Sequence, residues 1–250
     1  MQKKKIFVLS LAFIIIILVG LYFVFFKLNK KSVPEIKITQ TETTNIKIED
    51  KKISDSANPF KIDITYPEIL GHNDFNALAK NIVDEEISDF KTYSLENDNA
   101  VKETDPENYA KYPREYELII SYDKGQVDND IASIVFNIYS FEGGAHGSSY
   151  TIPLNYDFKN KKEIVLSDIF VGQKNYLQTI SDYCIADLTN QIIASAGEEY
   201  TDKDWIKTGA GPIAENFDIF LINKDSVTFY FPQYQVAAYA YGDFKVTMPR

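Results

Sequence analysis

Cysteine and histidine are scarce in this 250-residue sequence. The single cysteine, Cys184, has no partner for an internal disulfide, so the core alone must hold the fold. It also lies far from the N-terminus, which excludes a lipid-modified N-terminal cysteine. The two histidines, His72 and His146, show no H-E-x-x-H or H-x-H spacing, so a zinc site is not indicated. The sequence therefore predicts no cofactor.

Basic residues are also in short supply beyond the N-terminus. Residues 1–31 carry six lysines and no acidic residue, whereas residues 32–250 carry 20 Lys and Arg against 36 Asp and Glu, a formal charge of −16. Such a surface repels phosphate backbones and anionic lipid headgroups. The charge excludes nucleic acid as a partner and a domain that lies on an anionic membrane. It favours a cationic partner, or it only keeps the domain soluble.

One long apolar run is present, at residues 6–26, and three lysines precede it. At ~1.5 Å per residue, a helix of this run spans ~31 Å, close to the ~30 Å hydrocarbon core of a bilayer. A long cleaved signal peptide is the alternative, but no A-x-A-like cleavage triplet follows. We predict a single transmembrane helix at residues 6–26, in the cell membrane.

Orientation is argued from the size of the flanking segments. Lysines flank both ends of the run, so the positive-inside count is nearly balanced. Five residues cannot form a domain, so residues 1–5 are predicted to be cytoplasmic and the remainder extracytoplasmic. Residues 27–57 are interpreted as a tether, in which the alternation of Ile46 and Ile48 allows a short docked strand.

Residues 58–250 show the patterns of a globular fold. Alternating or continuous apolar runs predict strands, and a 3.6-residue apolar period predicts two amphipathic helices. Strands are predicted at residues 60–67, 116–122, 134–141, 150–156, 217–221, 227–231 and 244–248. Helices are predicted from a cap at Asn73 or Asp74 to Phe90, and at 174–196, where Cys184 lies on the inner face. Residues 96–113 are interpreted as a surface loop and 123–130 as a turn. The predicted class is α+β with mostly antiparallel sheets.

The loop at residues 142–147 is a candidate site. Its glycines, which include Gly143 and Gly144, permit positive φ angles and would display His146 at a hairpin tip beside Glu142. A catalytic pair of Glu142 and His146 would still need a nucleophile or a metal. The alternative is that His146 fixes the loop by hydrogen bonds.

A second candidate site follows the strand at 227–231. Pro232, Tyr234, Tyr239 and Tyr241 lie close together, and tyrosines in a rigid loop give amphipathic contact area at low entropic cost. Tyr239 and Tyr241 fit the core equally well. The only tryptophan, Trp205, either anchors a helix or stacks on a sugar. The glycines at 209 and 211 lack the pattern of a phosphate-binding loop.

These segments resemble the extracytoplasmic region of the RsiV family, membrane-bound anti-sigma factors that sense lysozyme. The resembling residues are 142–147, Asn155-Tyr156-Asp157, 166–170, Pro232-x-Tyr234-x-Val236-Ala237-x-Tyr239-Ala240-x-Gly242 and Val246-x-Met248-Pro249. The same paired modules precede the catalytic domain of PdaC-type peptidoglycan deacetylases. The resemblance implies two packed subdomains, a PdaC-like module at 58–160 and an RsiV-like module at 161–250, without catalytic machinery of their own.

The resemblance also implies that lysozyme is bound through Pro232 and Tyr234. The predicted five-residue cytoplasmic tail is too short to bind a sigma factor, and no deacetylase domain follows Arg250, so neither the anti-sigma nor the enzymatic role is expected. We therefore expect a non-enzymatic, membrane-anchored binding or sensor domain that recognises lysozyme or peptidoglycan fragments. Its predicted ligand-binding residues are Glu142, Gly143, Gly144, His146, Pro232 and Tyr234. The alternatives are a cell-wall hydrolase that uses Glu142 and His146, and an envelope assembly factor.

Overall fold

The computed structural model describes residues 46–57, 59–112 and 114–250. The predicted transmembrane helix at 6–26, the cytoplasmic tail and most of the tether lie outside the described residues. Within the part that is described, no helix is both long enough and apolar enough to cross a membrane.

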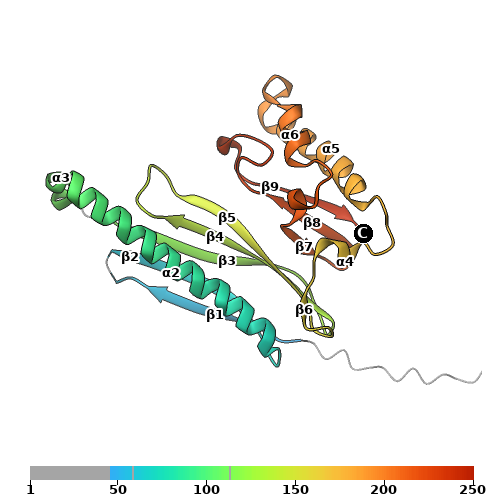
Figure 1. Cartoon of the computed structure of the whole chain (residues 1–250), viewed down its shortest axis with the longest axis horizontal. Helices are drawn as coiled ribbons and strands as arrows, with labels where there is room; N and C mark the ends of the chain where they lie inside the picture. The colour runs from blue at the N-terminus through green and yellow to red at the C-terminus, as the bar shows by residue number, and fades with distance from the viewer. Residues whose placement is uncertain (1–45, 58, 113) are drawn as a thin grey trace, which may run out of the picture. The chain divides into compact units, whose positions relative to one another are not determined.

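The N-terminal half of the described chain forms a six-stranded sheet in the order β1-β2-β3-β4-β5-β6 (Figure 1). Its strands are β1 (Ile48–Asp55), β2 (Phe60–Ile69), β3 (Tyr116–Val127), β4 (Ile131–Phe141), β5 (Ser148–Asp157) and β6 (Lys162–Glu163). The β2–β3 pair is parallel, because the helix α2 (Asn73–Thr104) connects the two strands as a crossover. The other pairs in this sheet are antiparallel. We call these strands, with α2 and α3 (Pro106–Lys111), the first module.

The first module has its own core between α2 and one face of the sheet. Phe75, Ala79, Val83 and Phe90 recur at helical spacing and are all buried, as their apolar period predicts. They pack on the inward residues of β2, β3 and β4. The predicted central position of residues 134–141 is confirmed, because β4 pairs with a strand on each side.

Two details of α2 differ from the sequence prediction. The N-cap is His72, which makes no side-chain capping bond, and Asn73 is already helical. The predicted loop at 96–113 is wrong, because α2 continues to Thr104 and α3 follows directly. Pro106 starts the new helix at a position where its missing N–H is not needed, and the Asp105 side chain caps it by accepting from the Asn108 N–H at 3.3 Å.

Two other segments are more regular than predicted. The turn expected at 123–130 is confined to residues 128–130, because β3 continues to Val127. The Asp128 carboxylate fixes that turn by accepting from the N–H groups of Asp130 at 2.9 Å and Ile131 at 3.1 Å. Residues 48–55, inside the predicted tether, form the edge strand β1, in line with the alternation that allowed a docked strand.

The C-terminal part forms a second module around a three-stranded antiparallel sheet in the order β7-β8-β9 (Figure 1). Its elements are α4 (Leu166–Ile169), α5 (Tyr176–Ala196), η1 (Glu198–Tyr200), α6 (Lys203–Gly209), η2 (Ala214–Phe217), β7 (Phe220–Ile222), β8 (Ser226–Phe231), η3 (Tyr239–Tyr241) and β9 (Phe244–Pro249). The apolar stripe of α5 packs in this core, including Cys184, as predicted. Burial, with a smaller effect of Asp187, raises the pKa of the Cys184 thiol to about 12, so the thiol stays protonated.

The strand predicted at 217–221 is shorter and shifted. Phe217 ends the 3₁₀ helix η2 and is fully buried, and β7 begins only at Phe220. The 3₁₀ turn places the Phe217 ring edge-on against Phe229, at 5.4 Å between centroids, so burial of the ring does not require a strand. The fold is thus α+β with one mixed and one antiparallel sheet among the described residues.

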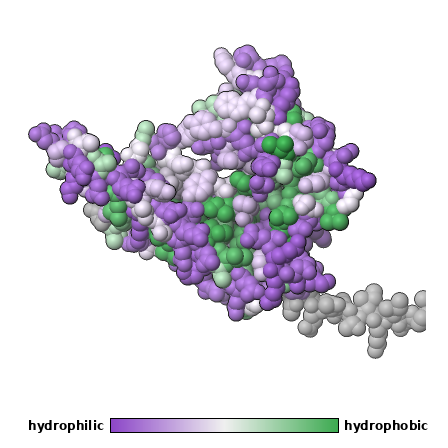
Figure 2. Space-filling model, in the orientation of Figure 1, coloured by the Kyte–Doolittle hydropathy of each residue, from purple (hydrophilic) through white to green (hydrophobic). Residues whose placement is uncertain are grey.

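The two modules meet through a buried polar cluster. The Ser133 hydroxyl donates to Asn155 Oδ1 at 2.5 Å and accepts from the Ile222 N–H at 2.7 Å, and Asn155 Nδ2 donates to the Phe220 carbonyl at 2.9 Å. All four residues are buried. Val135, Leu221 and Tyr230 pack beside them as a small apolar cluster. Figure 2 shows a largely hydrophilic face with apolar residues at its centre.

Candidate functional site

The two loops singled out from the sequence meet in space. The β4–β5 loop places the His146 ring 4.5 Å from the Tyr239 ring, with 34° between the planes. The Tyr239 hydroxyl donates to the Gly147 carbonyl at 3.2 Å. On the β8–β9 loop, the Tyr234 and Tyr239 rings lie 5.7 Å apart, again at 34°. We call His146, Tyr239 and Tyr234 the aromatic column.

The rings at the two ends of the column are accessible. Tyr234 is 60% exposed and His146 is exposed, whereas Tyr239 between them is half-buried. Large exposed aromatic rings gathered from separate segments are typical of binding surfaces, because each ring offers an apolar face and a polar edge. The column therefore has a solvent-accessible ring at each end.

Tyr234 sits on a strained turn. Its φ angle is +69°, a left-handed conformation that residues with a Cβ rarely adopt. The turn is closed by the Gln235 N–H, which donates to the Pro232 carbonyl at 3.0 Å. The Trp205 indole N–H donates to the Tyr234 carbonyl at 3.0 Å, and the Gln233 N–H donates to Asp243 at 3.0 Å. Strain of this kind persists where surrounding contacts over-determine it, often in ligand-binding segments.

The helix α6 packs against this turn. Gln235 Nε2 donates to the Gly209 carbonyl at 2.8 Å and to the Asn216 carbonyl at 2.9 Å. A Cβ on Gly209 would collide with the Gln235 carbonyl oxygen, so only glycine permits this approach. This packing role of Gly209 was not predicted from the sequence, where the glycines at 209 and 211 only lacked the pattern of a phosphate-binding loop. Trp205 anchors the loop through its indole N–H, a contact that sequence reasoning left undecided.

The two ends of the β4–β5 loop contact different parts of the first module. At its far end, Gly147 lies so close to the Tyr139 ring that a Cβ would be nearer than 3.0 Å. At its near end, the Glu142 carbonyl accepts from Asn97 of α2 at 2.8 Å, and the Gly143 carbonyl accepts from Arg114 at 3.3 Å.

Of the predicted residues, only part gathers at the column. His146 and Tyr234 belong to it, and Pro232 closes the turn that carries Tyr234. Gly144 is exposed. Among the described residues, no hydrogen bond or ion pair joins the Glu142 carboxylate to His146, whose Nδ1 lies 2.9 Å from the Gly147 carbonyl oxygen. The catalytic pairing of these two side chains is therefore absent from this conformation.

Acidic side chains gather on the α2 side of the hairpin. Burial raises the pKa of the Glu86 carboxyl, against the hydrogen bond from Tyr150, and the charges of Asp89 and Glu142 raise it further. Burial is the largest cause of this shift, and the neighbouring carboxylates add to it. Among the described residues, no three His, Cys, Asp or Glu side chains lie close enough to hold a metal ion.

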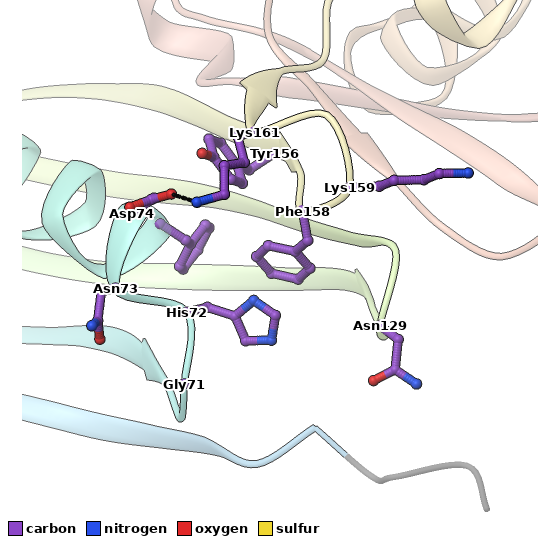
Figure 3. Close-up of a pocket in the computed structure, with 10 residues that line it drawn as sticks. Gly71, His72, Asn73, Asp74, Asn129, Tyr156, Phe158, Lys159 and Lys161 are labelled. Carbon is purple, nitrogen blue, oxygen red and sulfur yellow. Dashed lines mark ion pairs between the residues drawn. The ribbon is translucent and has the colours of Figure 1, made fainter. Parts of the chain in front are cut away.

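A separate hollow of about 440 Å³ lies where α2 begins (Figure 3). Its lining comprises Gly71, His72, Asn73, Asp74, Phe75, Asn129, Tyr156, Phe158, Lys159 and Lys161. The His72 and Phe158 rings lie 3.8 Å apart, and Lys161 is paired with Asp74 at 3.1 Å. Figure 3 shows Lys159 pointing away from the other lining side chains. The hollow thus contains one ion pair, Lys161 with Asp74, and one histidine ring packed on Phe158.

The strain at Tyr234 gives a testable expectation. Tyr234→Gly and Tyr234→Ala both remove the ring, but alanine keeps the positive-φ penalty that glycine avoids. We expect the glycine variant to unfold with a free energy about 1 kcal/mol higher than the alanine variant. Urea unfolding of both variants measures the difference. Equal stabilities would show that the turn relaxes to negative φ when the ring is absent.

Comparison with known proteins follows the division into modules. Residues 53–149 match the family model described as "Deacetylase PdaC". Residues 167–250 match the model described as "Protein of unknown function (DUF3298)". The chain is 26% identical, over 251 aligned residues, to the peptidoglycan-N-acetylmuramic acid deacetylase PdaC of Bacillus subtilis. All of the chain aligns, and it spans half of that relative's length.

Two crystal structures share the fold. A DUF3298 family member from Bacteroides fragilis superposes with a TM-score of 0.54 and 20% identity, over 83% of this chain and 91% of that one. A DUF3298 family protein from Pseudomonas aeruginosa gives a TM-score of 0.53 and 14% identity, over 83% of this chain and 92% of the other.

The comparisons correct one expectation. A non-enzymatic domain was expected from the sequence. The name of the Bacillus subtilis relative and the family model over residues 53–149 both point to an enzyme, so that expectation is wrong. The resemblance to the PdaC module is confirmed, and the resemblance to the RsiV family stays a prediction. Residues 53–149 are thus similar to a PdaC-type module, and residues 167–250 are similar to a DUF3298 module.

Proposed function

We propose that this chain recognises glycan strands of peptidoglycan and that this recognition serves peptidoglycan deacetylation. The observation that carries the proposal is the aromatic column, a set of rings with exposed ends to which both modules contribute. The deacetylase name of the relative and of the matching family model supports the choice of peptidoglycan as the polymer.

The chemistry of the column suits a saccharide. A pyranose ring presents a face of C–H groups that packs on an aromatic ring, while its hydroxyl groups bond to polar atoms at the edge. Tyr234 offers such a face, and the Gln233 side chain and Asp243 lie on the same loop.

The proposed location is the cell membrane, with both modules on the outside. Residues 6–26 would anchor the chain in the cell membrane with residues 1–5 inside. Residues 27–57 would lead to the two modules, taken as 58–160 and 161–250, on the outside where peptidoglycan lies. Two modules of cell-wall-related families support this location.

Lysozyme is the competing partner. The formal charge of −16 on residues 32–250 would attract a cationic protein, and Tyr234, 60% exposed on its turn, would be accessible to that protein. The glycan is preferred because the column combines rings from both modules. Binding of lysozyme through the Tyr234 turn alone would not need His146 of the first module. The binding experiment below separates the two partners.

Trp205 provides a built-in reporter, since it is the only tryptophan and bonds to Tyr234. The full chain is titrated with a tetrasaccharide of alternating N-acetylglucosamine and N-acetylmuramic acid, and separately with lysozyme, while tryptophan fluorescence is recorded. Tyr234→Ala is expected to weaken tetrasaccharide binding at least ~10-fold, which corresponds to about 1.4 kcal/mol. Released acetate, measured in the same mixtures, shows whether the chain itself deacetylates the glycan.

Tyr112→Ala is the matched control, because Tyr112 is 61% exposed, close to the 60% of Tyr234, and lies beside α3. It is expected to bind like the wild type. Binding of lysozyme without binding of the tetrasaccharide would replace the glycan proposal. Equal losses in both variants would remove the column from the site.

A further inference from the structure

We infer that the aromatic column links ligand binding to the docking of the two modules, so that an occupied site holds them closed. This inference rests on the proposed function and adds a means of regulation to the same site. Its basis is that His146 and Gly147 belong to the first module, whereas Tyr234 and Tyr239 belong to the second. The site is therefore complete only while the modules are docked.

The interface between the modules has a strong inner end. There the Ser133–Asn155 pair bonds to the backbone of β7, and Val135 and Leu221 pack beside it out of reach of solvent. Opening at this end would break these hydrogen bonds. Polar groups that stayed buried would then lack partners, so opening here is costly.

The middle of the interface is held by a charged contact. Asp123 of β3 accepts from the Tyr230 hydroxyl at 2.8 Å and from Lys245 Nζ at 2.7 Å, and Lys245 also lies 4.6 Å from the centroid of the Tyr230 ring. Burial alone would raise the pKa of the Asp123 carboxyl, but hydrogen bonds from Lys245 and Tyr230 outweigh it and hold the pKa below its ordinary value. The contact is half-exposed, so it is weaker than the buried inner end.

The outer end, at the column, is the weakest. Among the described residues, a hydrogen bond of 3.2 Å from Tyr239 to Gly147 and a ring contact with the exposed His146 join the modules here. Contacts that are exposed and few open first, at low free-energy cost. Along the interface, the contacts thus change from buried hydrogen bonds at the inner end to few, exposed contacts at the outer end. The rings of the aromatic column lie at the outer end, which opens most readily.

A ligand that touches rings of both modules binds the closed arrangement alone. It must then shift the equilibrium toward closure in proportion to its differential affinity for the two arrangements. A saccharide that packs along the column would turn a loosely held outer end into a fixed one. Binding of the glycan would thereby fix the two modules in the closed arrangement.

The test measures the distance between the modules directly. Gly144 is exposed and has room for a Cβ, and Ile213 is 54% exposed on the second module. Gly144→Cys and Ile213→Cys are combined in the full chain and labelled with nitroxides, while buried Cys184 stays unlabelled. The tetrasaccharide is expected to narrow the distance distribution. His146→Ala is expected to abolish the narrowing and to weaken binding ~10-fold.

Asp123→Asn tests the middle contact, since it removes the charge that Lys245 faces. It is expected to broaden the distribution of the free protein and to weaken binding ~3-fold to 10-fold. Asp84→Asn is the control, because Asp84 pairs only with Lys80 on the exposed face of α2. A tetrasaccharide that binds without changing the distances overturns the linkage but keeps the proposed function. Absence of binding overturns both.

Discussion

Replacing Gly209 by alanine is expected to lower the free energy of unfolding by about 1–3 kcal/mol and to disorganise the loop that carries Tyr234. The new Cβ would meet the carbonyl oxygen and carbon of Gln235, which are backbone atoms and cannot rotate away. Either α6 or the loop must move. Movement of the loop would break the bond from Trp205 to the Tyr234 carbonyl and the bonds from Gln235 to its two carbonyl acceptors.

Urea unfolding followed by Trp205 fluorescence measures the stability of this variant, and the native emission maximum reports the state of the loop. Loss of the indole hydrogen bond and partial exposure are expected to shift the native emission to longer wavelength. Gly144→Ala is the control, because its Cβ would meet only the His146 carbonyl at an ordinary 3.7 Å. A Gly209→Ala protein with wild-type stability and emission would show that α6 does not position the loop.

The fold was largely predictable because its signals are local. Alternating apolar residues in β2, β3 and β9 predict which face is buried, and the burial along β9 alternates residue by residue. The missed helix at 96–113 has a physical explanation. A proline after an acidic stretch indicated a loop, but Pro106 occupies a first helical turn, and Asp98 ties the end of α2 to Tyr109 and Tyr116 by bonds of 2.7 Å each.

Each of the two loops of the candidate site was predictable from the sequence, but their contact was not. Glycines around His146 and tyrosines around Tyr234 each indicated a loop suited to binding. Their meeting through Tyr239 and Gly147 joins positions 92 residues apart, and no local pattern carries that information. The supporting roles of Trp205 and Gly209 likewise depend on how α6 approaches the loop. A pair of glycines without a phosphate-loop pattern was the one signal of close backbone packing.

Asn155→Leu is expected to separate the unfolding of the two modules and to cost about 2–5 kcal/mol. Leucine resembles asparagine in size but removes the donor to the Phe220 carbonyl and the acceptor of the Ser133 hydroxyl. Each group left buried without a partner costs about 1–3 kcal/mol. The bond to Phe220 joins β5 to β7 and the bond from Ser133 joins β4 to β5, so their loss falls on the inner end of the interface.

Far-UV circular dichroism and Trp205 fluorescence follow the unfolding of Asn155→Leu in parallel, since Trp205 reports on the second module only. Coincident transitions in the wild type and two separated transitions in the variant are expected. The double variant Ser133→Ala/Asn155→Leu should lose less than the sum of the two single variants, because the hydroxyl left unpaired by leucine is then absent. Strictly additive losses would mean that the two side chains do not act as a pair, and the inner end would then depend on the apolar contacts of Val135 and Leu221 instead.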